Sequence, residues 1–336
     1  MRASIIFAVR TARITLNHPV IRSAVGCSLA AFAVPHRTTH SLAGPAPVPR
    51  QVKLGLCQIH VVDNKAENLK VAETAVREAV QEGAKIVSLP EIFNGPYAVN
   101  KFGPYAEEIP ESAASIDGKS SPSIALMSSL AKELRIYLIG GSIAEKDAQG
   151  KLYNTAVVFG PDGTILTKHR KMHLFDIDIP GKITFKESET LTSGNAPTLF
   201  DTPYGRIGVG ICYDIRFPQL ASLYRDAGAC LIVYPGCFNL TTGPAHWELL
   251  QRGRAVDNQL FVATVSQARN PDAGYQSWGH STIVSPWGTV LATTDHMSGN
   301  VYAELDLSEV EQIRKQVPVS FQKREDLYTT VKLRKK

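Results

Sequence analysis

The chain alternates between short apolar runs and segments in which apolar residues recur every three or four positions. The run over 52–59 is short and almost continuously apolar, which predicts a buried strand. Asp63 and Asn64 then predict the start of a helix, because Glu67 follows at the spacing of a capping box. Leucine, alanine and valine at helical spacing extend that helix to about Gly83. A strand and a helix therefore follow one another directly.

The same alternation continues along the rest of the chain, with hairpins between its parts. The apolar runs and helical periods predict strands over 86–90, 136–140, 206–212, 230–235 and 260–266, and helices over about 122–135, 217–227 and 245–257. Turn residues predict two β-hairpins, one joining 154–160 to the strand from Ile165 and one joining 280–285 to 290–293. Together these elements predict one α/β domain, with mixed sheets covered by helices.

Composition restricts the class of protein. The 336 residues are 44% hydrophobic and 20% charged, as in ordinary soluble domains that bury a large core. No stretch approaches the ~18 uninterrupted apolar residues of a membrane-spanning helix, so a membrane-embedded protein is excluded. The five cysteines show no paired spacing, which argues against a disulfide scaffold and against a zinc finger.

The net charge of +5 belongs to the first fifty residues. They contain six arginines but no lysine and no acid, and the first acidic residue of the chain is Asp63. The rest of the chain holds 30 basic against 31 acidic side chains, a net charge of −1. A nearly neutral folded part does not fit a phosphate backbone, so we expect no nucleic-acid partner.

Residues 1–50 have the composition of an organelle transit peptide, since they are rich in arginine, serine and threonine and lack acids. A secretory signal has a partial candidate in the apolar run 24–33, and an untargeted tail is a further alternative. The proline-rich stretch 44–49 predicts an extended linker. We expect import into mitochondria, with a plastid or the cytoplasm as alternatives, and a folded domain over 51–336.

Three residues with complementary chemistry follow predicted strands. Glu91 ends a short buried strand, Lys171 follows the first hairpin, and Cys212 precedes a helix whose first N–H groups could bind an anion. Ligands gather at the carboxyl ends of strands, so these side chains can converge. A thiolate is a nucleophile, a carboxylate can take its proton, and an ammonium can stabilise an oxyanion. Taken singly, each also fits a structural position, such as that of an inert core cysteine.

The sequences around these residues favour the chemical interpretation. They resemble the three signature boxes of the nitrilase superfamily, at 89–93, 169–173 and 210–218. The resemblance spans about 51–330. Within the superfamily the chain looks most similar to the ω-amidases, which hydrolyse the side-chain amides of 2-oxoglutaramate and 2-oxosuccinamate, and this similarity is carried by 174–185, 238–247 and 248–258.

The resemblance implies an architecture and a set of partners. The fold would be a four-layer α-β-β-α sandwich, in which two mixed β-sheets pack face to face with helices outside. Family members pair through helices, so a homodimer is expected, with residues 307–336 against the partner subunit. The expected ligand is a small amide that bears a free carboxylate, and no cofactor or metal is implied.

The resemblance also implies a role for each matching position. Glu91 would be the general base, Cys212 the nucleophile that forms a thioester, and Lys171 the cation beside the tetrahedral intermediate. Glu187 matches a second glutamate that positions the lysine, and Arg216 an arginine that grips the distal carboxylate of the substrate. Further contacts are expected from the backbone N–H of Tyr213 and from Tyr97, Thr241 and Thr242.

Other activities and sites stay open. The same triad serves other nitrilase-branch enzymes, such as a deaminated glutathione amidase, and the fold could also be a non-catalytic interaction protein. His169 and His173 could bind a metal from a helix, but no third ligand lies nearby. No P-loop, dinucleotide fingerprint or GxSxG elbow is present. The remaining cysteines of the folded part are expected in the core and the tryptophans as packing anchors: Cys57, Cys230, Cys237, Trp247, Trp278 and Trp287.

Overall fold

The structure is a computed structural model that describes residues 51–328. Every described residue belongs to one compact unit. The leader expected over 1–50 lies outside the described residues, and so does the basic end of the chain after residue 328. Within the described range, no helix combines the length and the apolar character needed to cross a membrane.

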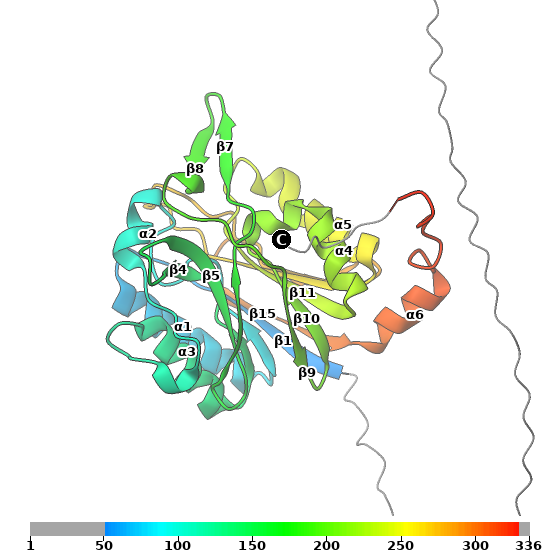
Figure 1. The fold of residues 1–336 in the computed structure, drawn as a ribbon, viewed down its shortest axis with the longest axis horizontal. Coiled ribbons are helices and arrows are strands. Elements are labelled where there is room, and N and C mark those ends of the chain that lie inside the picture. The colour runs from blue at the N-terminus through cyan, green and yellow to red at the C-terminus, as the bar shows by residue number, and fades with distance from the viewer. Residues whose placement is uncertain (1–50, 329–336) are drawn as a thin grey trace, which may run out of the picture. The chain divides into compact units, whose positions relative to one another are not determined.

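Seven of the described strands form one sheet (Figure 1). Their order is β15-β1-β2-β3-β5-β4, with β6 also paired to β5. Strands β1, β2 and β3 run parallel and the other pairs antiparallel, so the sheet is mixed. The strands are β1 (Gln51–Gln58), β2 (Ile86–Ser88), β3 (Tyr137–Ile139), β4 (Ile143–Lys146), β5 (Leu152–Phe159), β6 (Ile165–Arg170) and β15 (Gly299–Asp306).

Helices α1 (Lys65–Gln81) and α3 (Pro122–Leu134) cover one face of this sheet. Strand β5 shows how its two faces differ. Val157 and Phe159 pack with the two helices, whereas Val158 packs with residues of the second sheet. Because successive side chains of a strand point to opposite faces, one apolar strand can serve both layers.

Six further strands form the second sheet, in the order β14-β13-β12-β11-β10-β9. Helices α4 (Pro218–Asp226) and α5 (Gly243–Asn258) cover it closely. A Cβ at Gly208 of β10 would lie 2.7 Å from the ring of Tyr224 on α4, so this close approach requires glycine. The strands are β9 (Thr198–Thr202), β10 (Gly205–Val209), β11 (Ala229–Gly236), β12 (Phe261–Ser266), β13 (Thr282–Val284) and β14 (Val290–Thr293).

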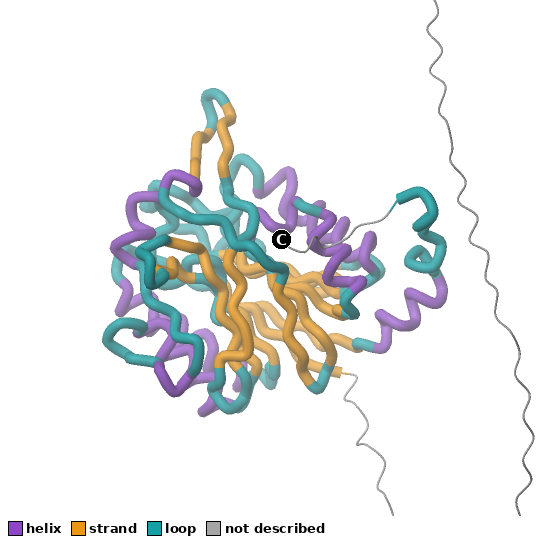
Figure 2. Tube along the Cα trace, viewed as in Figure 1, coloured by secondary structure: helices purple, strands orange, loops and turns teal. Residues whose placement is uncertain are grey.

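The two sheets pack face to face. One core cluster joins Leu54 and Ile86 of the first sheet to Val209, Val233 and Val262 of the second. Figure 2 shows the strands gathered in the interior and the helices on the outside. The predicted four-layer α-β-β-α sandwich is therefore confirmed.

Most predicted elements are present close to their expected bounds. Asn64 caps α1 by accepting the backbone N–H of Glu67 at 3.2 Å, and both predicted hairpins form. Helix α4 begins at Pro218, as predicted from about 217. The segment before it differs from the expectation, because Cys212–Arg216 forms a 3₁₀ turn and no helix starts directly after Cys212. Proline is favoured in the first turn of a helix, because a backbone N–H at that position would have no acceptor within the helix.

Some elements were not predicted. Strands β7 (Asp176–Ile179) and β8 (Ile183–Lys186) form a separate hairpin that projects from the domain (Figure 1). The others are the strands β4, β9 and β15, helices α2 (Val99–Tyr105) and α6 (Ser308–Gln316), and short 3₁₀ turns at Ala113–Ser115 and Glu187–Glu189.

The expected packing residues differ in how deeply they are buried. Cys57, Cys237 and Trp247 are buried as predicted, while Trp278 and Cys230 are only partly buried at the edge of the core. The prediction for Trp287 was wrong, since 63% of this residue is exposed. It lies in the turn between β13 and β14, where a side chain can point to solvent without leaving the hydrogen-bonded ladder.

Candidate active site

Glu91, Lys171 and Cys212 lie together in the interior. Lys171 Nζ is 2.8 Å from Glu91 Oε1, and the charges of both residues act on the thiol of Cys212. Only 3% of Cys212 is exposed, and the other two side chains are fully buried. The structure thus brings together three residues that the sequence placed only at the ends of separate strands.

The segment that carries Glu91 is bent sharply and held from two sides. Ile92 has a φ of +48°, which is unfavourable for a β-branched residue. Its N–H donates to Ser142 Oγ at 3.0 Å. The amide of Gln267 donates to the carbonyls of Glu91 (2.8 Å) and Ile92 (3.0 Å). Because Gln267 follows β12, the second sheet fixes a bend that belongs to the first.

Lys171 is held between two buried carboxylates. Its ammonium lies 2.8 Å from Glu91 Oε1 and 2.9 Å from Glu187 Oε1. Glu187 is itself fixed, because its Oε2 accepts the N–H of Phe175 at 2.7 Å and its Oε1 accepts the hydroxyl of Tyr97 at 2.7 Å. Because both carboxylates are themselves held in place, these two ion pairs fix the position of the Lys171 ammonium.

The two oxygens of Glu91 have different surroundings. Oε1 accepts from Lys171 and from Asn154 Nδ2, both at 2.8 Å. Oε2 is buried and has no hydrogen-bond partner among the described residues. A buried acceptor without a donor is costly, and its presence here fits an oxygen that receives a proton during a reaction.

Burial and neighbouring charges displace the proton affinities of all three groups. Burial raises the pKa of Glu91, aided by the charge of Glu187 and opposed by Lys171. Burial and the charge of Glu91 raise the pKa of Cys212 well above its ordinary value. Burial alone would lower the pKa of Lys171, but Glu187 and Glu91 raise it well above its ordinary value. The lysine is therefore a fixed cation, and the cysteine rests as a thiol.

Cys212 sits at a strained backbone position three residues after the end of β10. Its φ is +45°, in the left-handed region that a residue with a side chain rarely adopts. The backbone N–H of Cys237 points at its sulfur, with a nitrogen-to-sulfur distance of 3.4 Å. Cys237 follows β11, so the carboxyl ends of two neighbouring strands meet here.

Arg216 lies at the end of the 3₁₀ turn that starts with Cys212. Its guanidinium stacks over the ring of Phe238, 4.8 Å from the centroid, and Nη1 is 3.3 Å from His246 Nδ1. Nε is buried without a hydrogen-bond partner among the described residues. Burial lowers the pKa of Arg216, and no carboxylate of the described chain forms an ion pair with it. A planar cation with a free donor is suited to an anionic ligand.

The other expected contacts have varied surroundings. The backbone N–H groups of Thr241 and Thr242 both donate to Asn239 Oδ1, just before α5 begins. Thr241 is half-buried there. Tyr213 packs edge-on against Phe175. Tyr97 was expected to contact substrate, and its hydroxyl is occupied by Glu187 in this structure.

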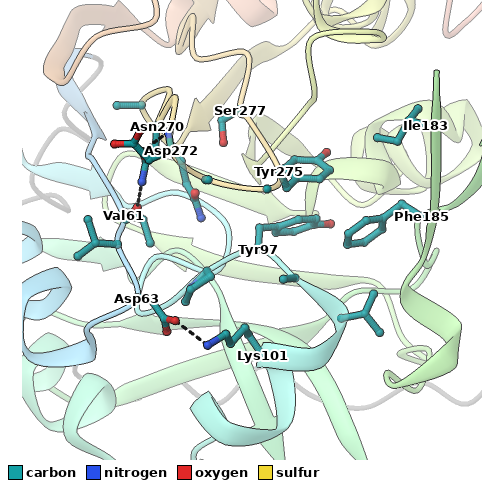
Figure 3. A pocket seen from close by; sticks show the side chains of 18 of the residues that line it. Val61, Asp63, Tyr97, Lys101, Ile183, Phe185, Asn270, Asp272, Tyr275 and Ser277 are labelled. Atoms are coloured by element: carbon teal, nitrogen blue, oxygen red, sulfur yellow. Dashed lines mark hydrogen bonds and ion pairs between the residues drawn. The ribbon is translucent and has the colours of Figure 1, made fainter.

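A cavity of about 570 Å³ is lined by Tyr97 and Gln267, but by none of Glu91, Lys171, Cys212 and Arg216. Figure 3 shows Tyr97, Tyr275 and Phe185 lining one side of it, with Asp63 and Lys101 paired elsewhere on its wall. The rings of Tyr97 and Tyr275 are 4.7 Å apart. Tyr97 therefore borders this cavity while its hydroxyl donates to the buried Glu187.

The metal site considered from the sequence is not supported by the described residues. His169 lies on strand β6 rather than on a helix, and both His169 and His173 contact Asp214. Across residues 51–328, no group of three or more His, Cys, Asp or Glu side chains could hold a metal ion.

Sequence reasoning missed several residues that hold the site together. Asn154 on β5 contacts Glu91, Gln267 supports its backbone, and Tyr275 donates from its hydroxyl to the carbonyl of Cys237 at 2.6 Å. Gln267 and Cys237 each follow a buried strand, as the triad residues do. The strand-end rule could have indicated these two, whereas nothing local distinguishes Asn154.

The comparisons with known proteins agree with this chemistry. The family model described as carbon-nitrogen hydrolase matches residues 53–315, which is most of the chain. The chain belongs to the carbon–nitrogen hydrolase family. The expected membership of the nitrilase superfamily is thereby confirmed.

Two similar members of the family are both named as ω-amidases. The protein is 59% identical to the ω-amidase NIT2 of Bos taurus over 276 residues, covering 82% of this chain and 96% of the relative. It is 55% identical over 295 residues to the chloroplastic ω-amidase of Arabidopsis thaliana, covering 88% of this chain and 78% of the relative. Similarity to the ω-amidase branch is therefore confirmed.

Solved structures of the family share the fold. The nitrilase-superfamily protein Nit3 of Saccharomyces cerevisiae is 42% identical with a TM-score of 0.74, covering 82% of this chain and 97% of that chain. The NitFhit protein of C. elegans is 33% identical with a TM-score of 0.73, covering 83% of this chain and 66% of that chain. Both support the layered arrangement of this carbon–nitrogen hydrolase.

Proposed function

We propose that the protein is an ω-amidase, which hydrolyses the side-chain amide of 2-oxoglutaramate or 2-oxosuccinamate to the 2-oxo dicarboxylate and ammonia. The names of its relatives support this assignment. Two features of the site together carry the assignment. One is the buried cluster of Glu91, Lys171 and Cys212. The other is the guanidinium of Arg216, which forms no ion pair with a carboxylate of the described chain. Such a site offers one place for an amide and one for a carboxylate.

The first half of the reaction forms a thioester. Glu91 accepts the proton of the Cys212 thiol on its free Oε2, and the sulfur adds to the amide carbon. The carbonyl oxygen becomes an oxyanion, which Lys171 and the backbone N–H of Tyr213 stabilise. Glu91 then gives its proton to the amide nitrogen, the carbon–nitrogen bond breaks, and ammonia departs.

The second half returns the enzyme to its starting state. Glu91 takes a proton from a water molecule, and the resulting hydroxide adds to the thioester carbon. The carbon–sulfur bond breaks, the thiolate regains a proton from Glu91, and the carboxylic acid product leaves. One carboxylate thus moves a proton in both directions, which requires a buried position with a raised pKa.

Arg216 supplies the test of the substrate class. Succinamate and butyramide differ only in a carboxylate against a methyl group. For Arg216→Leu we expect kcat/KM for succinamate to fall roughly 100-fold, the range for a lost charged hydrogen bond, and kcat/KM for butyramide to change less than about threefold. Equal losses on both amides would contradict the proposed clamp.

Ammonia release identifies the physiological amide. The wild-type protein is given 2-oxoglutaramate, deaminated glutathione, a carbamoyl compound and a nitrile, and ammonia is measured for each. The largest kcat/KM is expected for 2-oxoglutaramate. Release from deaminated glutathione alone would favour that amidase instead, and no release from any of them would favour a non-catalytic protein.

We also propose that two copies of the chain form a homodimer. Helix α5 and the β13–β14 turn carry exposed apolar side chains, at Leu249, Val256 and Trp287. Leu249 and Val256 are seven positions apart on α5, which places them on one face of that helix. Large exposed apolar groups on one face support contact with another protein surface. The segment from Leu307 would pack on the same partner.

We propose in addition that residues 1–50 direct the protein into an organelle, a mitochondrion in the first place and a plastid in the second. The acid-free, arginine-rich composition of these residues supports the proposal, and the relative from Arabidopsis thaliana is named chloroplastic. Fusion of residues 1–50 to a fluorescent protein tests it. Mitochondrial fluorescence is expected, plastid fluorescence would indicate the second destination, and a cytoplasmic signal would refute import.

A further inference from the structure

Asp214 is a buried carboxylate that the proposed mechanism does not use. It lies two residues after Cys212 and is fully buried. Its Oδ2 accepts the backbone N–H of Ile211 at 2.9 Å and His169 Nε2 at 3.0 Å. Its Oδ1 accepts both the backbone N–H of His173 at 3.0 Å and the ring Nδ1 of His173 at 2.7 Å. One side chain therefore collects four donors.

These donors come from the two segments that carry the reacting groups. Ile211 immediately precedes Cys212, whereas His169 and His173 stand two residues before and two residues after Lys171. The carboxylate thus joins the 3₁₀ turn of Cys212, which follows β10 of the second sheet, to the end of strand β6 of the first sheet. Its hydrogen bonds reach the chain on both sides of the lysine.

The contacts make Asp214 a firmly held anion. Burial alone would raise the pKa of Asp214, but the donors from His169 and His173 and the N–H of Ile211 hold it well below its ordinary value. A buried carboxylate with four donors is expensive to disturb, because each lost partner leaves a charge without compensation. The backbone of Cys212, at a φ of +45°, needs such support from its surroundings.

We propose that Asp214 is a positioning residue that sets the distance and orientation between the Cys212 thiol and the Lys171 ammonium, with His173 as its second anchor. The inference rests on the proposed cysteine chemistry and deepens it. Asp214 touches no reacting atom and acts through the backbone of the segments it joins. Misplacing reacting groups by about 1 Å costs on the order of 100-fold in rate, so a small loosening has a large effect.

His173 allows the positioning role to be separated from ordinary stability. Its side chain is 27% exposed, whereas those of His169 and Asp214 are fully buried, so changes at His173 disturb the fold least. The ring stacks on Phe217, with centroids 3.6 Å apart and planes 10° from parallel. His173 therefore makes a packing contact and a hydrogen bond, which different substitutions remove.

The experiment compares two variants of the full chain. His173→Phe keeps an aromatic ring over Phe217 and removes the donor to Asp214. His173→Asn removes the ring and keeps an amide N–H donor at the distance of Nδ1. We expect kcat for 2-oxoglutaramate to fall at least tenfold in His173→Phe with KM within about twofold, and to stay within about threefold of wild type in His173→Asn.

Thermal unfolding and thiol alkylation complete the test. A purely structural residue would make kcat follow the melting temperature, so His173→Asn, which loses the stacking, would be the worse enzyme. That order, or equal kcat values in the two variants, would overturn the proposal. Alkylation of Cys212 by iodoacetamide, followed by mass spectrometry, should slow in His173→Phe alone. Because this readout needs no amide, it remains decisive if 2-oxoglutaramate is not hydrolysed.

Discussion

At the scale of single residues, the proposed mechanism requires Cys212 to ionise in surroundings that oppose ionisation. Burial raises the pKa of its thiol, so thiolate does not accumulate in the resting protein at neutral pH. Burial also raises the pKa of Glu91, which makes its carboxylate a stronger base than that of an exposed glutamate. The free Oε2 of Glu91 is available for that proton. In the proposed mechanism the Cys212 thiol therefore gives its proton directly to Glu91 rather than to solvent.

Removal of the proposed nucleophile tests the reaction class. For Cys212→Ala we expect ammonia release to fall by roughly 10⁴-fold or more, because no other side chain can form the thioester. The melting temperature should change little, since a small buried group is replaced by another. Cys57→Ala is the matched control, because Cys57 is equally buried but lies on β1 in the cluster under α1. Loss of activity in that control as well would contradict the assignment.

The acidic side of the pH profile tests the electrostatics. Glu91 must be ionised to accept the thiol proton, so kcat/KM rises as the pH passes the pKa of Glu91. The negative charge of Glu187 raises that pKa. In Glu187→Gln the pKa of Glu91 falls, and the acidic limb of kcat/KM moves to lower pH while kcat decreases. The wild type, measured on the same substrate, corrects for titration of the substrate. A limb that stays fixed or moves upward would contradict this account.

The sequence predicted the reactive residues of the site but not the amide side chains that hold them in place. Glu91, Lys171 and Cys212 carry reactive groups at strand ends, so their chemistry suggested them. Asn154 and Gln267 act through amides whose partners are 63 and 175 or more positions away. An amide has no chemistry of its own to indicate a site, so its contribution becomes visible only once the strands are in place.

At the scale of elements, the site depends on two sharp bends that follow β2 and β10. Both contain a residue with positive φ, Ile92 in the first and Cys212 in the second. A side chain holds the backbone of each bend. Gln267 donates to the carbonyl of Ile92 in the first bend, and Asp214 accepts the N–H of Ile211 in the second. Strain of this kind, about 1–3 kcal/mol per residue, persists only where such support exists.

Gln267→Leu removes the support of the first bend. Two buried carbonyls lose their donor, so we expect a loss of about 1–3 kcal/mol in the free energy of unfolding and at least a tenfold fall in kcat. Gln58→Leu is the control. Its amide likewise donates to two carbonyls, those of Asp295 and Met297, away from the triad residues. Urea unfolding should show a loss in Gln58→Leu at least as large as in Gln267→Leu, because the backbone N–H and hydroxyl of Ser281 also lose their acceptor, Gln58 Oε1. The fall in kcat should nevertheless appear only in Gln267→Leu. Equal kcat values would contradict the role.

Local pattern also explains which elements were found and which were missed. The segments of β7 and β8 alternate apolar and polar residues around Pro180 and Gly181, so a hairpin could have been predicted there. The exposure of Trp287 follows from the turn that the sequence itself predicted, since a side chain at a turn tip has little core to enter. The pairing of β15 with β1 could not be predicted, because their residues are more than 240 positions apart.

At the scale of the whole molecule, the face-to-face packing of the sheets assembles the site. Glu91 and Lys171 follow strands of the first sheet, and Cys212 follows a strand of the second. Periodicity predicted strands and helices, but the division into two sheets came from family resemblance, since burial on both faces looks alike in any α/β fold. The reactive groups thus lie on two packed sheets, whose relative position must be kept.

The proposed dimer extends this dependence beyond one chain. Trp287 is 63% and Leu249 68% exposed, and pairing of two copies would remove these apolar surfaces from water. A charge at the centre of such an interface is unfavourable, so Trp287→Asp should convert the dimer to a monomer at micromolar concentration in sedimentation velocity. Leu166→Asp, on the exposed surface of β6, is the control and should leave the dimer intact. A wild-type protein that sediments as a monomer, or a Trp287→Asp variant that remains dimeric, would refute this interface.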